Sequence, residues 1–193
     1  KRMWEHILFK NTQLAIQAFE RMWSEACKPG GRDSLMRFQK LCQDVKTWSD
    51  HMMREHANLI TSKCDYFRDL VACAITANAK VLCIIKLRKN PEKVNVPVPT
   101  NEMFLHTMMT NMAENLYNEP WIMQDKDQFN RRKVLKDILR EALHDAIDQH
   151  LPKREILVAN IGTGIEELEE TEAPDEPLDD VDAFEDPGPV GEG

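Results

Sequence analysis

The strongest constraint on the fold is the stretch from Leu35 to Lys89, which contains neither glycine nor proline. Because these two residue types interrupt helices most strongly, nothing in this stretch opposes helix formation. One set of positions in this stretch also follows alternating steps of four and three residues, which is the spacing of one face of a helix. The positions on this face, most of them apolar, are 38, 42, 45, 49, 52, 56, 59, 63, 66, 70, 73 and 77. The stretch therefore predicts helices whose common apolar face is buried.

Polar residues interrupt this face at Ser49, His56 and Lys63. We therefore expect a helical hairpin or bundle rather than one long free helix. Ser62, followed by Asp65 three residues later, has the spacing of a capping box and predicts a helix start. The run "VLCII" at 81–85 fits a strand or a helix, and we favour the helix.

The rest of the chain extends the helical pattern. Residues 3–27 have apolar side chains at helical spacing before the turn "KPGGRD". A methionine-rich helix follows Thr100 or Asn101, and its methionines fit either a core or an adaptable partner surface. Asp127 is a candidate N-cap for a last helix with a regular apolar stripe. The predicted fold is all-α, a helical bundle or hairpin with an extended proline-containing arm and an acidic C-terminal tail.

These signals divide the chain into four parts. Three prolines between residues 89 and 101 predict an extended arm, in which Val96 and Val98 could contact a partner or simply form part of a linker. The parts are an N-terminal helical region (1–90), the proline linker (91–101), a C-terminal helical region (102–165) and the acidic tail (166–193).

The charge of the chain is very unevenly distributed. The net charge of the whole chain is −8. Residues 1–165, the body, nevertheless hold all 25 Lys and Arg residues and only 20 of the Asp and Glu residues. The remaining 13 acidic residues lie in the tail, which has no basic residue. Such a tail contacts the basic body, docks on a basic partner, or only solvates the chain, and we expect it to be disordered or ordered by a partner.

The cysteines and the hydropathy favour an intracellular protein without a membrane span. The five cysteines are odd in number and have no CxxC spacing, so we expect reduced, buried thiols. The most apolar run, "LVACAITANAKVLCII" at 70–85, is too short to cross a bilayer and contains Asn78 and Lys80.

The sequence shows no signature of catalysis. It has no GxSxG, no glycine-rich phosphate loop and no CxxC motif. Its six histidines have no HxxxH spacing, and no cysteine or carboxylate completes a zinc set. We therefore expect no enzyme activity, no metal, no cofactor and no small-molecule substrate.

The densest basic patch is "NRRK", which includes Arg131, Arg132 and Lys133. These side chains could contact phosphate or an acidic protein segment, or they could lie on a solvated helix face. Carboxylates on the same helix and the scarcity of aromatic residues disfavour nucleic acid. The candidate partner-binding residues are therefore Trp121, which follows Pro120, the basic residues Arg131, Arg132 and Lys133, and the valines Val96 and Val98.

Residues 115–157 resemble a C-terminal module of small helical proteins from icosahedral nucleocytoplasmic large DNA viruses. The resemblance consists of a Tyr/Asn–Pro–aromatic turn, a charged spacer, an amphipathic helix that ends in "LP", and a short "xxIL" helix. The corresponding residues are Tyr117, Asn118, Pro120 and Trp121, then Ile138 through Ile147, then Leu151, Pro152, Ile156 and Leu157.

The resemblance implies a minor capsid protein that lies beneath the major capsid shell and acts as a scaffold or glue. Its partners would be the major capsid protein, copies of itself, or both, and its location would be the virion, assembled in the host cytoplasm. The alternative is a soluble regulatory adaptor that binds a host protein or nucleic acid through the basic patch or the acidic tail.

Overall fold

The structure is a computed structural model that describes residues 3–30, 32–84 and 96–157. Within these ranges the backbone forms helices and turns and no strand, so the predicted all-α class is confirmed. Residues 91–95 of the arm and the acidic tail, residues 166–193, lie outside the described residues. The helices are α1 (Met3–Thr12), α2 (Leu14–Cys27), α3 (Ser34–Asp44), η1 (Val45–Thr47), α4 (Asp50–Thr61), α5 (Phe67–Ile84), α6 (Asn101–Asn118), η2 (Pro120–Gln124) and α7 (Gln128–Gln149), where η marks a 3-10 helix.

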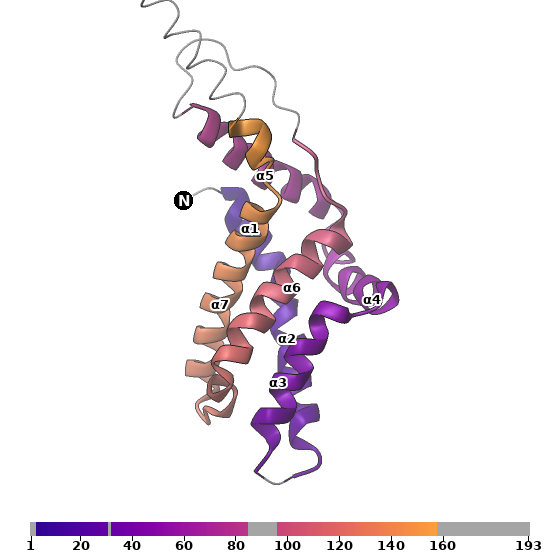
Figure 1. Cartoon of the computed structure of the whole chain (residues 1–193), viewed down its shortest axis with the longest axis vertical. Coiled ribbons are helices and arrows are strands. Elements are labelled where there is room, and N and C mark those ends of the chain that lie inside the picture. The colour runs from indigo at the N-terminus through magenta and orange to yellow at the C-terminus, as the bar shows by residue number, and fades with distance from the viewer. Residues whose placement is uncertain (1–2, 31, 85–95, 158–193) are drawn as a thin grey trace, which may run out of the picture.

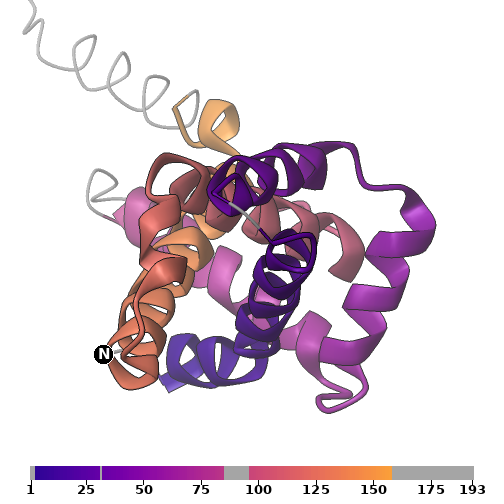
Figure 2. The ribbon, with the colours of Figure 1, turned by 90° about the horizontal axis from the view of Figure 1, so that it is seen from below.

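The methionine-rich helix α6 lies at the centre of the body. It packs against α3, α4, α5, α7 and both 3-10 helices. Figure 1 shows it running beside α7, and Figures 1 and 2 place α4 on the side of the body away from α7. Thr100 caps its first turn, because its hydroxyl oxygen accepts a hydrogen bond from the Met103 amide. Helices from both ends of the chain therefore meet on one element.

The buried face of α6 is unusually wide. Its eight buried residues spread over roughly 200° of the helix surface, at 100° per residue. They are Phe104, Leu105, Met108, Met109, Asn111, Met112, Ala113 and Leu116. Of the two roles that the sequence allows for the methionines, the core role is confirmed at three of these positions, whereas Met103 is exposed.

A single apolar core runs through both helical regions. Its buried residues extend along the chain from Leu8 to Ile156 and include side chains of every α-helix. The extended segment before α6 adds Val96, which packs against this core. The two helical regions, 1–90 and 102–165, therefore share their interior in the described part of the chain.

Arg37 closes the hairpin between α2 and α3. Its guanidinium donates hydrogen bonds to the carbonyl oxygens of Ala26, at 2.7 Å, and Gly30, at 2.8 Å. Gly30 has a φ of 72°, a left-handed conformation that glycine adopts without a steric penalty. Trp23 and Phe38 pack edge to face across the hairpin, with ring centroids 5.5 Å apart.

The apolar face predicted along residues 38–77 is only partly correct. Phe38, Cys42 and Val45 are buried as expected. Beyond them the buried positions shift by one residue to 53, 57, 60, 64 and 67, so that Met52, Leu59 and Tyr66 are exposed. The shift follows from the backbone at Trp48, which leaves the helical conformation with φ −57° and ψ 134°. Ser49 then starts a new helix by accepting a hydrogen bond from the Met52 amide.

The predicted helix start at Ser62 is wrong. The Ser62 hydroxyl donates to the carbonyl oxygen of Leu59 at the end of α4, and α5 begins at Phe67. Serine hydroxyls bond backbone carbonyls as readily as amides, so the residue spacing alone does not distinguish a helix end from a helix start. The helical interpretation of "VLCII" is confirmed as far as Ile84.

The expectation that the cysteines are buried also fails in part. The structure describes the side chains of four, all free, of which Cys42 and Cys64 are buried while Cys27 and Cys73 are exposed. Burial raises the pKa of the Cys42 thiol to about 12, because the apolar surroundings disfavour the thiolate. Cys42 is therefore inert at neutral pH.

The shifted register of α4 can be tested with two adjacent residues. Ile60 is 3% exposed and Leu59 is 53% exposed. We expect Ile60→Ala to lower the free energy of unfolding by ~2–5 kcal/mol, because it leaves a cavity in the core. Leu59→Ala should change it by less than ~0.5 kcal/mol. Urea denaturation followed by circular dichroism measures both, and a larger loss for Leu59→Ala would restore the register predicted from the sequence.

Candidate interaction surface

The connection between α6 and α7 carries the candidate Trp121. Helix α6 ends at Asn118, and Pro120, which has no amide hydrogen to donate, opens the 3-10 helix η2. A 3-10 helix has three residues per turn, so Pro120 and Met123 share one face, and both are buried. Trp121 falls on the outer face and is 58% exposed. The next residue, Ile122, packs against the core instead.

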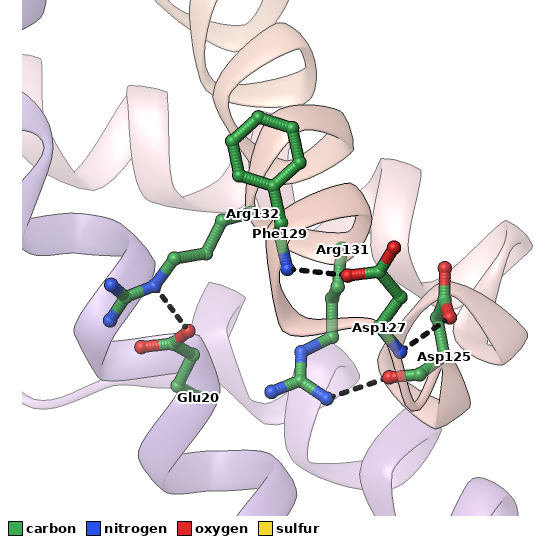
Figure 3. Close-up of polar contacts among 6 residues, drawn as sticks. All are labelled: Glu20, Asp125, Asp127, Phe129, Arg131 and Arg132. Carbon is green, nitrogen blue, oxygen red and sulfur yellow. Dashed lines mark hydrogen bonds and ion pairs between the residues drawn. The ribbon is translucent and has the colours of Figure 1, made fainter.

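Two aspartates fix the backbone after η2. The Asp127 carboxylate accepts hydrogen bonds from the amides of Phe129, at 2.9 Å, and Asn130, at 3.3 Å, which confirms Asp127 as the N-cap of α7. The Asp125 carboxylate accepts from the Asp127 amide at 3.0 Å and from the Asn130 side chain at 2.7 Å. Figure 3 shows the Asp127 carboxylate at the Phe129 amide and the Asp125 carboxylate at the Asp127 amide. The connection is thus held by its own hydrogen bonds.

These hydrogen bonds also change the acidity of Asp125. The Asn130 side chain is the main cause that lowers the pKa of its carboxyl, and the Asp127 amide adds to the effect. Both donors favour the charged form of the carboxyl. The connection is therefore best ordered when Asp125 is ionised.

Phe129, on the first turn of α7, is 81% exposed and was not among the residues predicted from the sequence. The buried stripe of α7 comprises Leu135, Leu139, Ala142, Leu143, Ala146 and Ile147. Phe129 lies before this stripe, so the apolar pattern of α7 does not place its large side chain in the core. That mismatch is the sequence signal that would have found it.

The three basic candidates have different surroundings. Arg131 is half-buried and donates to the carbonyl oxygen of Asp125 at 2.9 Å, so it helps to hold the connection. Arg132 reaches across to Glu20 on α2, with 3.3 Å between Nε and Oε1, as Figure 3 shows. Lys133 is exposed and has no ion-pair partner among the described residues. The "NRRK" patch is thus partly used within the body.

The two valines lie far from this connection. Val96 packs against the core and Val98 is half-buried, so the described end of the arm lies on the body. They precede α6, whereas Trp121 follows it, and 18 residues at 1.5 Å per residue separate the two ends of the helix by roughly 27 Å. The six predicted residues therefore do not form one site.

The titratable groups that burial perturbs are scattered over the body. Burial lowers the pKa of His56 on α4, which stacks on Trp48, and of His150 after α7. Cys42, whose pKa burial raises, is on a third element, α3. Nowhere in residues 3–30, 32–84 and 96–157 do three His, Cys, Asp or Glu residues gather as a metal site would require. Active sites usually bring perturbed groups together, and the described residues do not do so.

No helix in the described part of the chain is both long and apolar enough to span a membrane. Fold and surface together define an all-α protein in which the hydrogen-bonded connection between α6 and α7 exposes Trp121, and the first turn of α7 exposes Phe129. The chain belongs to a family of unknown function (DUF5764), whose profile matches residues 1–124, from the N-terminal helix into η2. No curated protein and no solved structure matches it.

The hydrogen bond from Asn130 predicts a measurable change in the acidity of Asp125. We expect Asn130→Ala to raise the pKa of the Asp125 carboxyl toward its ordinary value, as read from the pH dependence of its carbon resonance by NMR. The folded state holds this pKa low, so Asp125 stabilises it above the ordinary pKa and loses that contribution as the pH falls. The exposed Asn118→Ala is the control, and equal pKa values in both variants would contradict the hydrogen bond.

Proposed function

We propose that the protein is a non-catalytic structural interaction protein and that residues 120–129, the aromatic connection, contact a partner protein. The observation that supports this most directly is the exposure of Trp121 and Phe129 within one short, hydrogen-bonded segment. Tryptophan is enriched among the residues that dominate the binding energy of protein interfaces.

The hydrogen bonds of Asp125, Asp127 and Arg131 favour such a function, because they order the segment before a partner arrives. Ordering a flexible loop on binding would cost free energy that the contacts must offset. Here the backbone of residues 125–130 is already fixed by contacts of 2.7 to 3.3 Å. Trp121 and Phe129 project from a segment that needs little rearrangement.

In its particular form, the proposal is a viral minor capsid protein that contacts the inner face of the major capsid shell. The support is the resemblance of residues 115–157, which include the whole aromatic connection. The family match covers residues 1–124 and overlaps this segment only over residues 115–124. The partners would be the major capsid protein, further copies of the chain, or both.

One observation favours the second candidate, a regulatory adaptor for a host protein or nucleic acid. Lys133 and Arg132 keep exposed side chains on α7, close in sequence to Phe129. An acidic or phosphate-bearing partner could use these charges together with the aromatic rings. The two candidates differ in where the protein is found and in how many copies.

The test is the number of copies per particle, measured by quantitative mass spectrometry on purified virions of the source. We expect a fixed number of copies, in a simple ratio to the major capsid protein. Virions that carry the double variant Trp121→Ala, Phe129→Ala should retain fewer than about a tenth of the copies, since loss of a hot-spot residue costs ~2 kcal/mol or more.

The matched control is Met103→Ala, because Met103 is also 58% exposed but lies at the other end of α6. It should leave the copy number unchanged, and circular dichroism should show all variants equally helical. The capsid proposal fails if wild-type virions contain no copies while the protein co-purifies with one host factor. The proposed contact fails if the double variant and Met103→Ala are retained equally.

A further inference from the structure

A cavity of about 320 Å³ lies where α1, α2 and α7 meet the turn between α4 and α5. Four cationic side chains from three parts of the chain line it: Lys10 of α1, Lys63 of the turn, and Arg132 and Lys136 of α7. Glu20 is the one carboxylate in the lining that the structure describes. Positive charge is therefore concentrated in a hollow rather than spread over a convex surface.

The charge of this cavity is only partly neutralised from within. Arg132 pairs with Glu20, as Figure 3 shows, whereas Lys10, Lys63 and Lys136 have no ion-pair partner in the described part of the protein. Like charges that converge from separate elements repel one another, and that repulsion is relieved by an anion between them. The arrangement has a net excess of three positive charges.

The remaining lining suits a phosphate-bearing ligand. Gln13 and Gln17 supply side-chain amides, which can donate to phosphate oxygens or to hydroxyl groups, whereas the Asn11 amide already donates to the Ile7 carbonyl oxygen. Leu14 and Ile16 supply an apolar part of the wall. A few converging polar groups on a partly apolar wall, in a volume near 300 Å³, are typical of small-molecule sites.

A second, adjoining cavity extends the basic region. It has a volume of about 200 Å³, shares Leu14, Gln17 and Lys63 with the first, and adds Arg21 and Ser62. Lys63 thus lines both cavities, of which the first has three further cationic side chains and the second has Arg21. A ligand with several linked phosphates can contact both, whereas a single phosphate fills only one.

We propose that these two cavities, the basic pocket, bind a small polyphosphate, an anion with at least two linked or neighbouring phosphate groups. The volumes favour a small ligand over an extended nucleic acid. The inference is independent of the aromatic connection and goes beyond a purely structural role. Bound polyphosphate would tie α1, α2 and α7 together.

Isothermal titration calorimetry of the full-length chain with inorganic tripolyphosphate tests the proposal. We expect saturable binding of one tripolyphosphate per chain, and weaker binding of inorganic phosphate. Lys136→Gln should weaken tripolyphosphate binding by about tenfold, as expected for the loss of one charge-assisted hydrogen bond. Lys133→Gln is the matched control, since it removes the same charge from the same helix outside the pocket, and it should bind as the wild type does.

A third variant makes the test more specific, because it should strengthen tripolyphosphate binding rather than weaken it. Glu20→Gln removes the carboxylate and releases Arg132, so it should strengthen tripolyphosphate binding several-fold. It should lower the unfolding temperature only slightly, because the Arg132 side chain of this pair is 62% exposed and such ion pairs contribute little. A variant that merely disturbed packing would weaken binding instead.

Three results would overturn the proposal. They are the absence of saturable binding, equal losses for Lys136→Gln and Lys133→Gln, and tighter binding of a double-stranded DNA oligomer than of tripolyphosphate through the same lysines. The last result would assign the basic pocket to nucleic acid.

Discussion

The wide buried face of α6 is the constraint on which the rest of the structure depends. A helix at the surface of a globular protein usually buries one stripe, but α6 buries a sector wide enough for several neighbours. Methionine suits such a position, since its unbranched side chain fills gaps of irregular shape between helices that approach from different directions. The side chains of the surrounding helices therefore need to fit the surface of α6 more closely than they need to fit one another.

Polar groups then fix how the neighbours are aligned along α6. Asn111, which is buried, donates to the carbonyl oxygen of Ala142 and accepts from the side chain of Gln149, so its amide sets the register between α6 and α7. On the other side, the His106 ring donates to the carbonyl oxygen of Val45 at 3.0 Å. A buried polar group left without its partner is costly, so these contacts discriminate against helices that have slipped along α6.

This alignment has consequences at both proposed surfaces. Because α7 is held against α6, its first turn presents Phe129 beside the fixed connection that carries Trp121. The same alignment directs Arg132 and Lys136 toward α2, where they meet Lys10 and Lys63 at the basic pocket. The connection at residues 120–129 and the basic pocket thus use neighbouring parts of α7.

The fold class and the cap of α7 could be predicted because each depends on residues close together in the chain, whereas the pattern left the role of the methionines open. The register of α4 could not, since a single extended residue, Trp48, shifts the buried positions from Met53 to Phe67 by one residue, and nothing in the spacing predicts this shift. The exposure of Trp121 is not contained in the pattern, which does not reveal that η2 is a 3-10 helix, whose period decides which side chain faces out. The basic pocket was beyond sequence reasoning, because Lys10, Lys63 and Lys136 are brought together only by the packing of distant helices.

Native-state hydrogen exchange, measured amide by amide with NMR, tests the central role of α6 most directly. If the body is organised around this helix, the amides from Leu105 to Leu116 exchange only through global unfolding and are the slowest in the chain. Those of α4, at the side of the body, exchange faster through local opening. The account is contradicted if the α6 amides exchange as fast as those of α4, or if α6 opens while α3 and α7 stay protected.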